Sequence, residues 1–78
     1  MPDVLMPRLG ADMEDGVLVQ WRVAVGDVVL RTTAVAYIET SKGAFEVEAF
    51  AEGVVEALLA APGDVVPVGA PLVRLRTG

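Results

Sequence analysis

The sequence repeats itself at an offset of 37 residues, and this constrains the fold more than any other feature. Aligning residues 16–40 with 53–77 without gaps gives eight identities in 25 pairs, where composition alone would give roughly two or three. The stretch Gly26-Asp27-Val28-Val29 matches Gly63-Asp64-Val65-Val66 in full. With 78 residues, the chain is expected to form one domain, residues 1–78, built from two copies of one unit.

Both copies have the pattern of short β-strands. Residues 17–23 alternate in a way that predicts Val17, Val19, Trp21 and Val23 on one face, and residues 44–49 and 73–76 alternate too. Valine occurs fifteen times, and β-branched residues favour pleated strands. Turns are expected at four glycines: Gly16, Gly26, Gly53 and Gly63. Close turn signals without helical periodicity predict an all-β sandwich or flattened barrel.

One segment breaks the repeat. Residues 4–7 resemble 47–50 at an offset of 43, so the first copy carries about six extra residues before Gly16. They fall in the segment 9–15, which we expect to be a surface loop. An asymmetric loop in a quasi-symmetric fold is a candidate for partner recognition, although a tolerated insertion explains it equally well. The candidate recognition residues are Leu9, Gly10, Asp12, Met13, Glu14 and Asp15.

The chain has one lysine. The other five basic residues are arginines, so generic surface charge is supplied by arginine and Lys42 stands apart. An amine can lose its proton and form an amide, whereas a guanidinium effectively cannot. Lys42 falls in Ser41-Lys42-Gly43, between expected strands at 34–40 and 44–50, which predicts an exposed hairpin tip. An ordinary solvated lysine is the alternative reading of this position alone.

Composition excludes several other classes of function. The chain has no cysteine and no histidine, which removes disulfides, thiolate and histidine metal sites, and Ser-His or Cys-His dyads. A net charge of −5 argues against nucleic acid and anionic membranes as partners. No basic region followed by an apolar run opens the chain, and no stretch is apolar enough to span a membrane. We therefore expect a cytoplasmic domain that is monomeric in isolation.

These residues resemble the lipoyl domains of 2-oxo acid dehydrogenase acyltransferases. The family pattern is roughly Glu-Thr-Asp-Lys-Ala, and this chain reads Glu39-Thr40-Ser41-Lys42-Gly43, with Gly26 and Gly53 at the family's spacings. The segments 6–10 and 13–16 are similar to the family's Met-Pro-x-Leu-Gly and x-Glu-Gly motifs. Ser41 and Gly43 depart from the pattern without removing the amine, and Ser41 bears on how efficiently the lysine is modified.

The resemblance implies a flattened barrel, or barrel-sandwich hybrid, of two four-stranded antiparallel sheets related by a quasi-twofold axis. It implies lipoate amide-linked to Lys42 by a lipoate ligase or lipoyl transferase. The non-catalytic carrier then serves a thiamine diphosphate-dependent decarboxylase, an acyltransferase core and a dihydrolipoyl dehydrogenase. Glu39, Thr40, Ser41 and Gly43 would present the lysine. Glu39, Glu46 and Glu48 are further recognition candidates, although a solvated strand face accounts well for Glu46 and Glu48.

Three other functions are alternatives for a chain with these features. A biotin carrier also modifies a hairpin lysine, but that family has methionines on both sides, where this chain has Ser41 and Gly43. An unmodified module of the same shape, acting structurally, would need no lysine at the tip. A Schiff-base enzyme would need a desolvated lysine in a pocket. The opening segment leans toward a pyruvate or acetoin complex, and the chain's end resembles the start of a linker in a longer acyltransferase.

Overall fold

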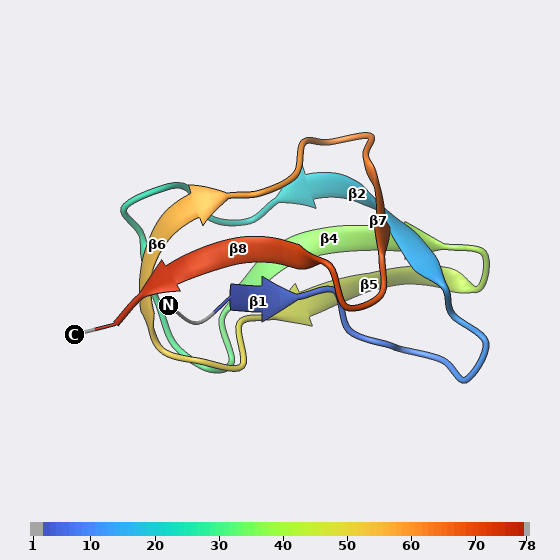
Figure 1. The fold of residues 1–78 in the computed structure, drawn as a ribbon, viewed down its shortest axis with the longest axis horizontal. Helices are drawn as coiled ribbons and strands as arrows, with labels where there is room; N and C mark the ends of the chain where they lie inside the picture. Colours follow the sequence, from blue (N-terminus) through green and yellow to red (C-terminus); the bar gives the residue numbers. More distant parts are fainter. Residues whose placement is uncertain (1–2, 78) are drawn as a thin grey trace.

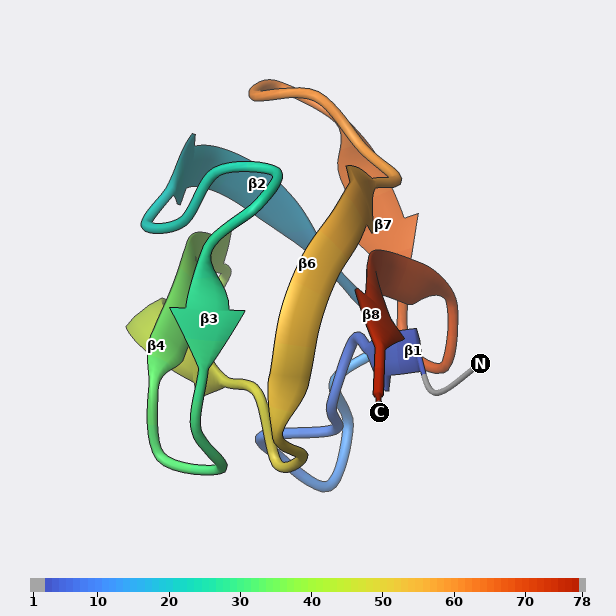
Figure 2. The same ribbon diagram turned by 90° about the vertical axis from the view of Figure 1, so that its left-hand side faces the viewer.

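The computed structural model describes residues 3–77, and every regular element in that range is a β-strand. The strands form two antiparallel sheets, with the orders β1-β8-β6-β3 and β5-β4-β2-β7 (Figure 1). Figure 2, which looks along the long axis, shows strands from both sheets arranged around a common centre. The eight strands are β1 (Asp3–Leu5), β2 (Asp15–Trp21), β3 (Val28–Val29), β4 (Ala34–Thr40), β5 (Gly43–Glu48), β6 (Gly53–Leu58), β7 (Val65–Pro67) and β8 (Pro71–Arg76).

The sequence repeat relates the two sheets. The offset of 37 carries β2, β3 and β4 onto β6, β7 and β8, and the offset of 43 carries β1 onto β5. Exchanging these partners turns the order of one sheet into the order of the other. The register follows the same rule, because Val17 pairs with Val65 while Val54 pairs with Val28. The predicted pair of four-stranded antiparallel sheets with quasi-twofold symmetry is therefore confirmed.

The core lies between the sheets and is purely aliphatic, with methionine and no aromatic residue among its buried members. Of the residues that the structure describes, no polar or charged side chain is buried. The core therefore depends on apolar burial, which contributes roughly 25 cal/mol per Å² of surface removed from water. Its buried residues come from both copies: Val4, Met6, Leu18, Val29, Val35, Ala36, Ile38, Val47, Ala49, Val55, Val66, Leu72, Val73 and Leu75.

The predicted face of β2 was wrong in its first half. Leu18 is fully buried, whereas Val19 is 38% exposed. The pairing of β2 with β4 shifts between Leu18 and Gln20, so Val19 is an extra residue in a bulge, which reverses the alternation. Trp21 does pack against the core, as expected. The second copy has the same irregularity between Val55 and Ala57, so the bulge belongs to the repeated unit.

The two Gly-Asp turns have the same geometry. Gly26 and Gly63 both have a φ of 96°, which L side chains rarely adopt. Asp27 Oδ2 accepts a hydrogen bond from the backbone N–H of Ala24 at 2.9 Å. Asp64 Oδ2 accepts one from the N–H of Ala61, also at 2.9 Å. Each carboxylate thus closes its own turn, and the prediction of turns at these two glycines is confirmed.

Gly16 and Gly53 have a different role from the one predicted. Both lie inside strands, in β2 and β6, rather than in turns. A Cβ on Gly16 would lie 2.5 Å from Cγ2 of Ile38, and a Cβ on Gly53 would lie 2.8 Å from the carbonyl oxygen of Arg76. These glycines are therefore required by close approach of a neighbouring strand.

The hairpin between β4 and β5 lies toward the opposite end of the long axis from the end of β8 (Figure 1). The molecule measures 36 × 22 × 17 Å, which is a flattened barrel. The turn between β4 and β5 and the loop between β1 and β2 lie at the right-hand end in Figure 1, while β8 ends toward the left. Within residues 3–77, no helix has the length and hydropathy needed to cross a membrane.

Candidate functional site

A two-residue hairpin carries the lysine. Strand β4 ends at Thr40, β5 begins at Gly43, and these two residues pair with each other, so Ser41 and Lys42 alone make the turn. Gly43 has a φ of 137°, a conformation that favours glycine. The predicted hairpin is confirmed. A loop this short fixes the register of the two strands, and the position of the Lys42 backbone relative to them is fixed as a result.

Thr40 braces the turn from inside. Its Oγ1 accepts a hydrogen bond from the backbone N–H of Lys42 at 3.1 Å and donates one to the carbonyl oxygen of Gly43 at 3.0 Å. A single hydroxyl thus ties both sides of the turn together. Each such bond contributes about 0.5–1.5 kcal/mol net. Thr40 is therefore the residue that holds the backbone of Lys42 in place.

The amine of Lys42 is accessible. The lysine side chain is 69% exposed, and its Nζ lies 3.2 Å from Oδ2 of Asp12, which is itself 72% exposed. An ion pair this exposed stabilises the fold by about 0–1 kcal/mol. The nitrogen is neither buried nor on a helix, so another protein can reach it. The desolvated pocket that a Schiff-base lysine requires is not formed around this side chain.

The loop between β1 and β2 is held by its own contacts. The backbone N–H of Met13 donates to the carbonyl oxygen of Gly10 at 3.1 Å, and Nη1 of Arg8 donates to the carbonyl oxygen of Met13 at 2.7 Å. The Sδ atom of Met13 accepts from the backbone N–H of Leu9 at 3.2 Å, and its side chain packs against the core. Met13 therefore anchors the loop to the barrel.

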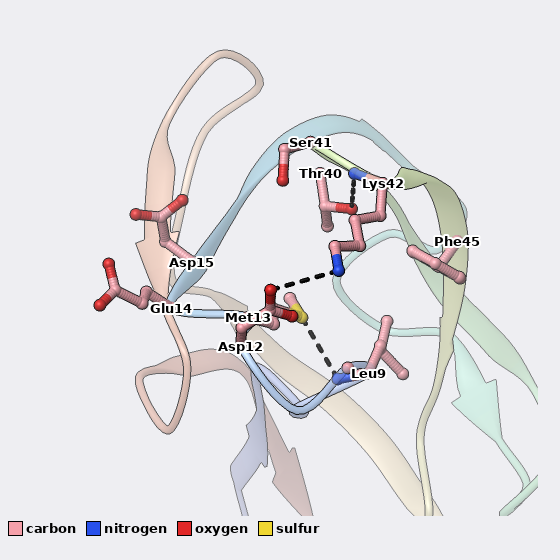
Figure 3. Close-up of a pocket in the computed structure, with 10 residues that line it drawn as sticks. Leu9, Asp12, Met13, Glu14, Asp15, Thr40, Ser41, Lys42 and Phe45 are labelled. Carbon is pink, nitrogen blue, oxygen red and sulfur yellow. Dashed lines mark hydrogen bonds and ion pairs between the residues drawn. The ribbon is translucent and has the colours of Figure 1, made fainter.

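Loop and hairpin together enclose a pocket of about 360 Å³. Figure 3 shows the Lys42 side chain running from the turn toward Asp12, with Leu9 and Phe45 on the other side of its Nζ. The sequence-predicted recognition residues meet the hairpin here, while Glu39 and Gly43 do not line the pocket. The residues that line it are Leu9, Gly10, Asp12, Met13, Glu14, Asp15, Thr40, Ser41, Lys42 and Phe45.

Three side chains of β5 differ in their surroundings. Phe45 lines the pocket and was not singled out as a site residue from the sequence, although the alternation of residues 44–49 separates it from Glu46 and Glu48. Glu46 is engaged elsewhere, because its Oε2 lies 3.3 Å from Nε of Arg22. Arg22 also lies over the ring of Tyr37, 5.4 Å from its centroid. Glu46 and Glu48 are both exposed, as expected for a solvated strand face.

Comparison with known proteins identifies the family. Residues 2–75 match the biotin/lipoyl family model, described as "Biotin-requiring enzyme". The solution structure of the lipoyl domain of the 2-oxoglutarate dehydrogenase complex from Azotobacter vinelandii covers the whole chain with a TM-score of 0.75 and 32% identity, over 99% of that domain. The chain is a lipoyl domain of this family. As such, it belongs to a family whose members carry a covalently attached lipoyl or biotinyl group.

Two curated relatives of the lipoyl domain are much longer proteins. The pyruvate dehydrogenase E1 component subunit beta of Rhizobium meliloti is 42% identical over 74 residues, 94% of this chain. The dihydrolipoyllysine-residue succinyltransferase component of the 2-oxoglutarate dehydrogenase complex of Staphylococcus saprophyticus is 39% identical over 69 residues, 88% of this chain. The lipoyl domain spans 16% of each of these relatives. Both are components of 2-oxo acid dehydrogenase complexes.

Proposed function

We propose that Lys42 carries lipoate as an amide and that the domain moves acyl groups and reducing equivalents within a 2-oxo acid dehydrogenase complex. One observation carries the proposal: the only lysine of the chain stands on a braced two-residue turn with its side chain 69% exposed. The lipoyl domains and acyltransferase components among its relatives support lipoate over other groups.

The residues at the turn fit such a group. Lys42 supplies a primary amine that can attack an activated carboxyl carbon, lose a proton and form the C–N bond as the activating group leaves. Thr40 holds the backbone of Lys42 while this happens, through its two hydrogen bonds. When bound, lipoate supplies a dithiolane that accepts an acyl group and two electrons. Amide formation removes one positive charge, so the net charge of the chain changes from −5 to −6.

The proposed partners follow from this role. We propose a lipoate ligase or lipoyl transferase as the enzyme that attaches lipoate. We propose that the lipoyl-lysine arm then visits the active sites of a thiamine diphosphate-dependent decarboxylase, an acyltransferase core and a dihydrolipoyl dehydrogenase. Tethering the arm to these enzymes replaces free diffusion by a high effective concentration. The loop from Leu9 to Asp15 is the proposed recognition surface for the decarboxylase. It lies beside Lys42, so an enzyme that binds the loop also receives the arm.

The host protein that we propose is a dihydrolipoyl acyltransferase component, in which this domain is non-catalytic. The Staphylococcus saprophyticus relative supports this choice. The Rhizobium meliloti relative, named as an E1 subunit beta, makes a decarboxylase subunit the alternative host. In either host protein, Lys42 would have the same function.

The proposal is tested by intact mass. The chain is incubated with lipoate ligase, lipoate and ATP, beside a Lys42→Arg variant that keeps the positive charge but cannot form the amide. We expect one lipoyl addition in the parent and none in the variant. A parallel incubation with biotin ligase, biotin and ATP tests the alternative that the family description raises. Addition of biotin alone, or a lipoyl addition to Lys42→Arg, would refute the proposal.

A further inference from the structure

The Lys42 side chain folds back toward the loop between β1 and β2. Its Nζ reaches to within 3.2 Å of Asp12 Oδ2, which belongs to that loop (Figure 3). Lys42 also lines the pocket that the loop and the hairpin enclose. An acyl group attached to this nitrogen would therefore begin at the pocket, although the Lys42 side chain itself is exposed.

The pocket offers apolar surface close to that starting point. Leu9 is 40% exposed, and Met13 and Phe45 are half-buried, so the three side chains present carbon and sulfur atoms to the space between them. The volume of about 360 Å³ lies within the range of roughly 300–1,000 Å³ that small-molecule pockets occupy. An apolar arm that enters the pocket removes its own surface and these side chains from water, and this burial favours binding.

The pocket is formed before any arm is attached. The carbonyl oxygen, N–H and Sδ of Met13 are all engaged in hydrogen bonds within the loop, and its side chain packs against the core. The backbone of Phe45 is held in β5, where Phe45 lies opposite Ile38 of β4. Because the loop at Met13 and the strand at Phe45 are already in place, an entering group loses less freedom than it would in a pocket that must first form.

We propose that this pocket is a seat for the apolar part of the arm on Lys42, with Leu9, Met13 and Phe45 as its walls. The inference rests on the proposed function, because it requires a lipoyl group on Lys42. Amide formation removes the ammonium that pairs with Asp12. The amide keeps one N–H, which can donate a hydrogen bond to the Asp12 carboxylate. The exposed residues Asp12, Glu14 and Asp15 also line the pocket, so part of it faces water and the arm can leave the seat for solvent.

The test compares two modified forms of the same domain by NMR. One form carries lipoate on Lys42, and the other carries an acetyl group, which removes the same charge without providing an arm. Completeness of both modifications is verified by intact mass. We expect nuclear Overhauser effects between the arm and both the ε-methyl of Met13 and the ring of Phe45 in the lipoyl form. Shifts of these resonances that are the same in the acetyl form would reflect charge removal alone and would count against the seat.

A matched pair of variants locates the seat. Leu9 and Leu30 are both exposed, and Leu30 lines a separate pocket beside β3. Leu9→Ser should lower the ratio of arm bound in the pocket to arm free in solvent, by about fourfold for each methylene group of the arm that becomes exposed to water. Leu30→Ser should leave this ratio unchanged. A fully lipoylated domain without Overhauser effects to Met13 or Phe45, or equal effects in both variants, would overturn the seat and leave Lys42 as the attachment site. Absence of the lipoyl addition would overturn the proposed function and the seat with it.

Discussion

Alanine at position 53 tests why the two copies of the fold need glycine at the same place. The added Cβ would lie 2.8 Å from the carbonyl oxygen of Arg76 and 3.3 Å from Cβ of Leu75. The first of these atoms is backbone, so it cannot move aside by rotating a side chain. Strands β6 and β8 would have to separate where Val54 and Val55 pair with β8.

The expected cost of Gly53→Ala is about 1–3 kcal/mol of unfolding free energy, as for other overpacked sites. In a domain of this size, each kcal/mol lowers Tm by roughly 4–8 °C. Thermal and urea unfolding can be followed by the fluorescence of Trp21, which packs against the core and donates a hydrogen bond to the carbonyl oxygen of Ala60 at 3.1 Å. Gly16→Ala should act in the same direction, since its Cβ would meet a buried methyl of Ile38.

Gly10→Ala is the matched control. A Cβ at Gly10 meets nothing within 4 Å, and its backbone is not in the left-handed region. That substitution should be neutral or stabilising by up to about 1 kcal/mol, because alanine reduces the entropy of the unfolded chain. Equal stability of Gly53→Ala and Gly10→Ala would show that β8 does not approach position 53 closely enough to exclude a Cβ.

Five further substitutions probe the turns and the loop. Asp27→Ala and Asp64→Ala should each lower the free energy of unfolding by about 1 kcal/mol, because each carboxylate accepts an equivalent hydrogen bond. Urea unfolding should show that the two losses add in the double variant, and unequal losses would argue against matched turns. Thr40→Val should cost about 1 kcal/mol and speed hydrogen exchange at the Lys42 amide, whereas Thr40→Ser should not; equal exchange in both would exclude the hydroxyl as the brace. Asp12→Asn should change thermal stability by less than about 1 kcal/mol, because its pair with Lys42 is exposed, and a larger loss would mean that the loop depends on this ion pair.

The repeat and the alternation predicted a two-copy all-β sandwich or flattened barrel, and the family resemblance implied its two four-stranded sheets. The offset of 37 residues relates the strands of one sheet to those of the other. The expected strands at 34–40 and 44–50 predicted the hairpin, which the structure forms between Thr40 and Gly43. The inner face of β2 could not be read in the same way. A bulge at Val19 adds one residue to the strand, and a strict period of two cannot represent an added residue.

The sequence singled out Lys42 and the loop residues as candidates, but neither Phe45 nor the arrangement of these residues could be predicted from it. Lys42 and the loop residues were identified from their singularity and from the break in the repeat. Their meeting depends on Met13, whose side chain reaches the core and draws the loop over the hairpin, and on Arg8, which donates to its carbonyl oxygen. Phe45 joins the site through that approach. Approaches of this kind come from tertiary packing, which no local pattern encodes. The cytoplasmic location and the monomeric state stay predictions.

We propose that the braced β-turn holds the only side-chain amine at one defined position for a modifying enzyme. The most direct test exchanges two neighbours, Ser41→Lys with Lys42→Ser, which keeps composition and charge and moves the amine by one residue. The rate of lipoyl addition is measured by intact mass with the same ligase, lipoate and ATP, and circular dichroism verifies that both chains are folded. We expect rapid addition to the parent and little or none to the exchanged chain. Equal rates would contradict it, because the position of the amine on the turn would then not matter.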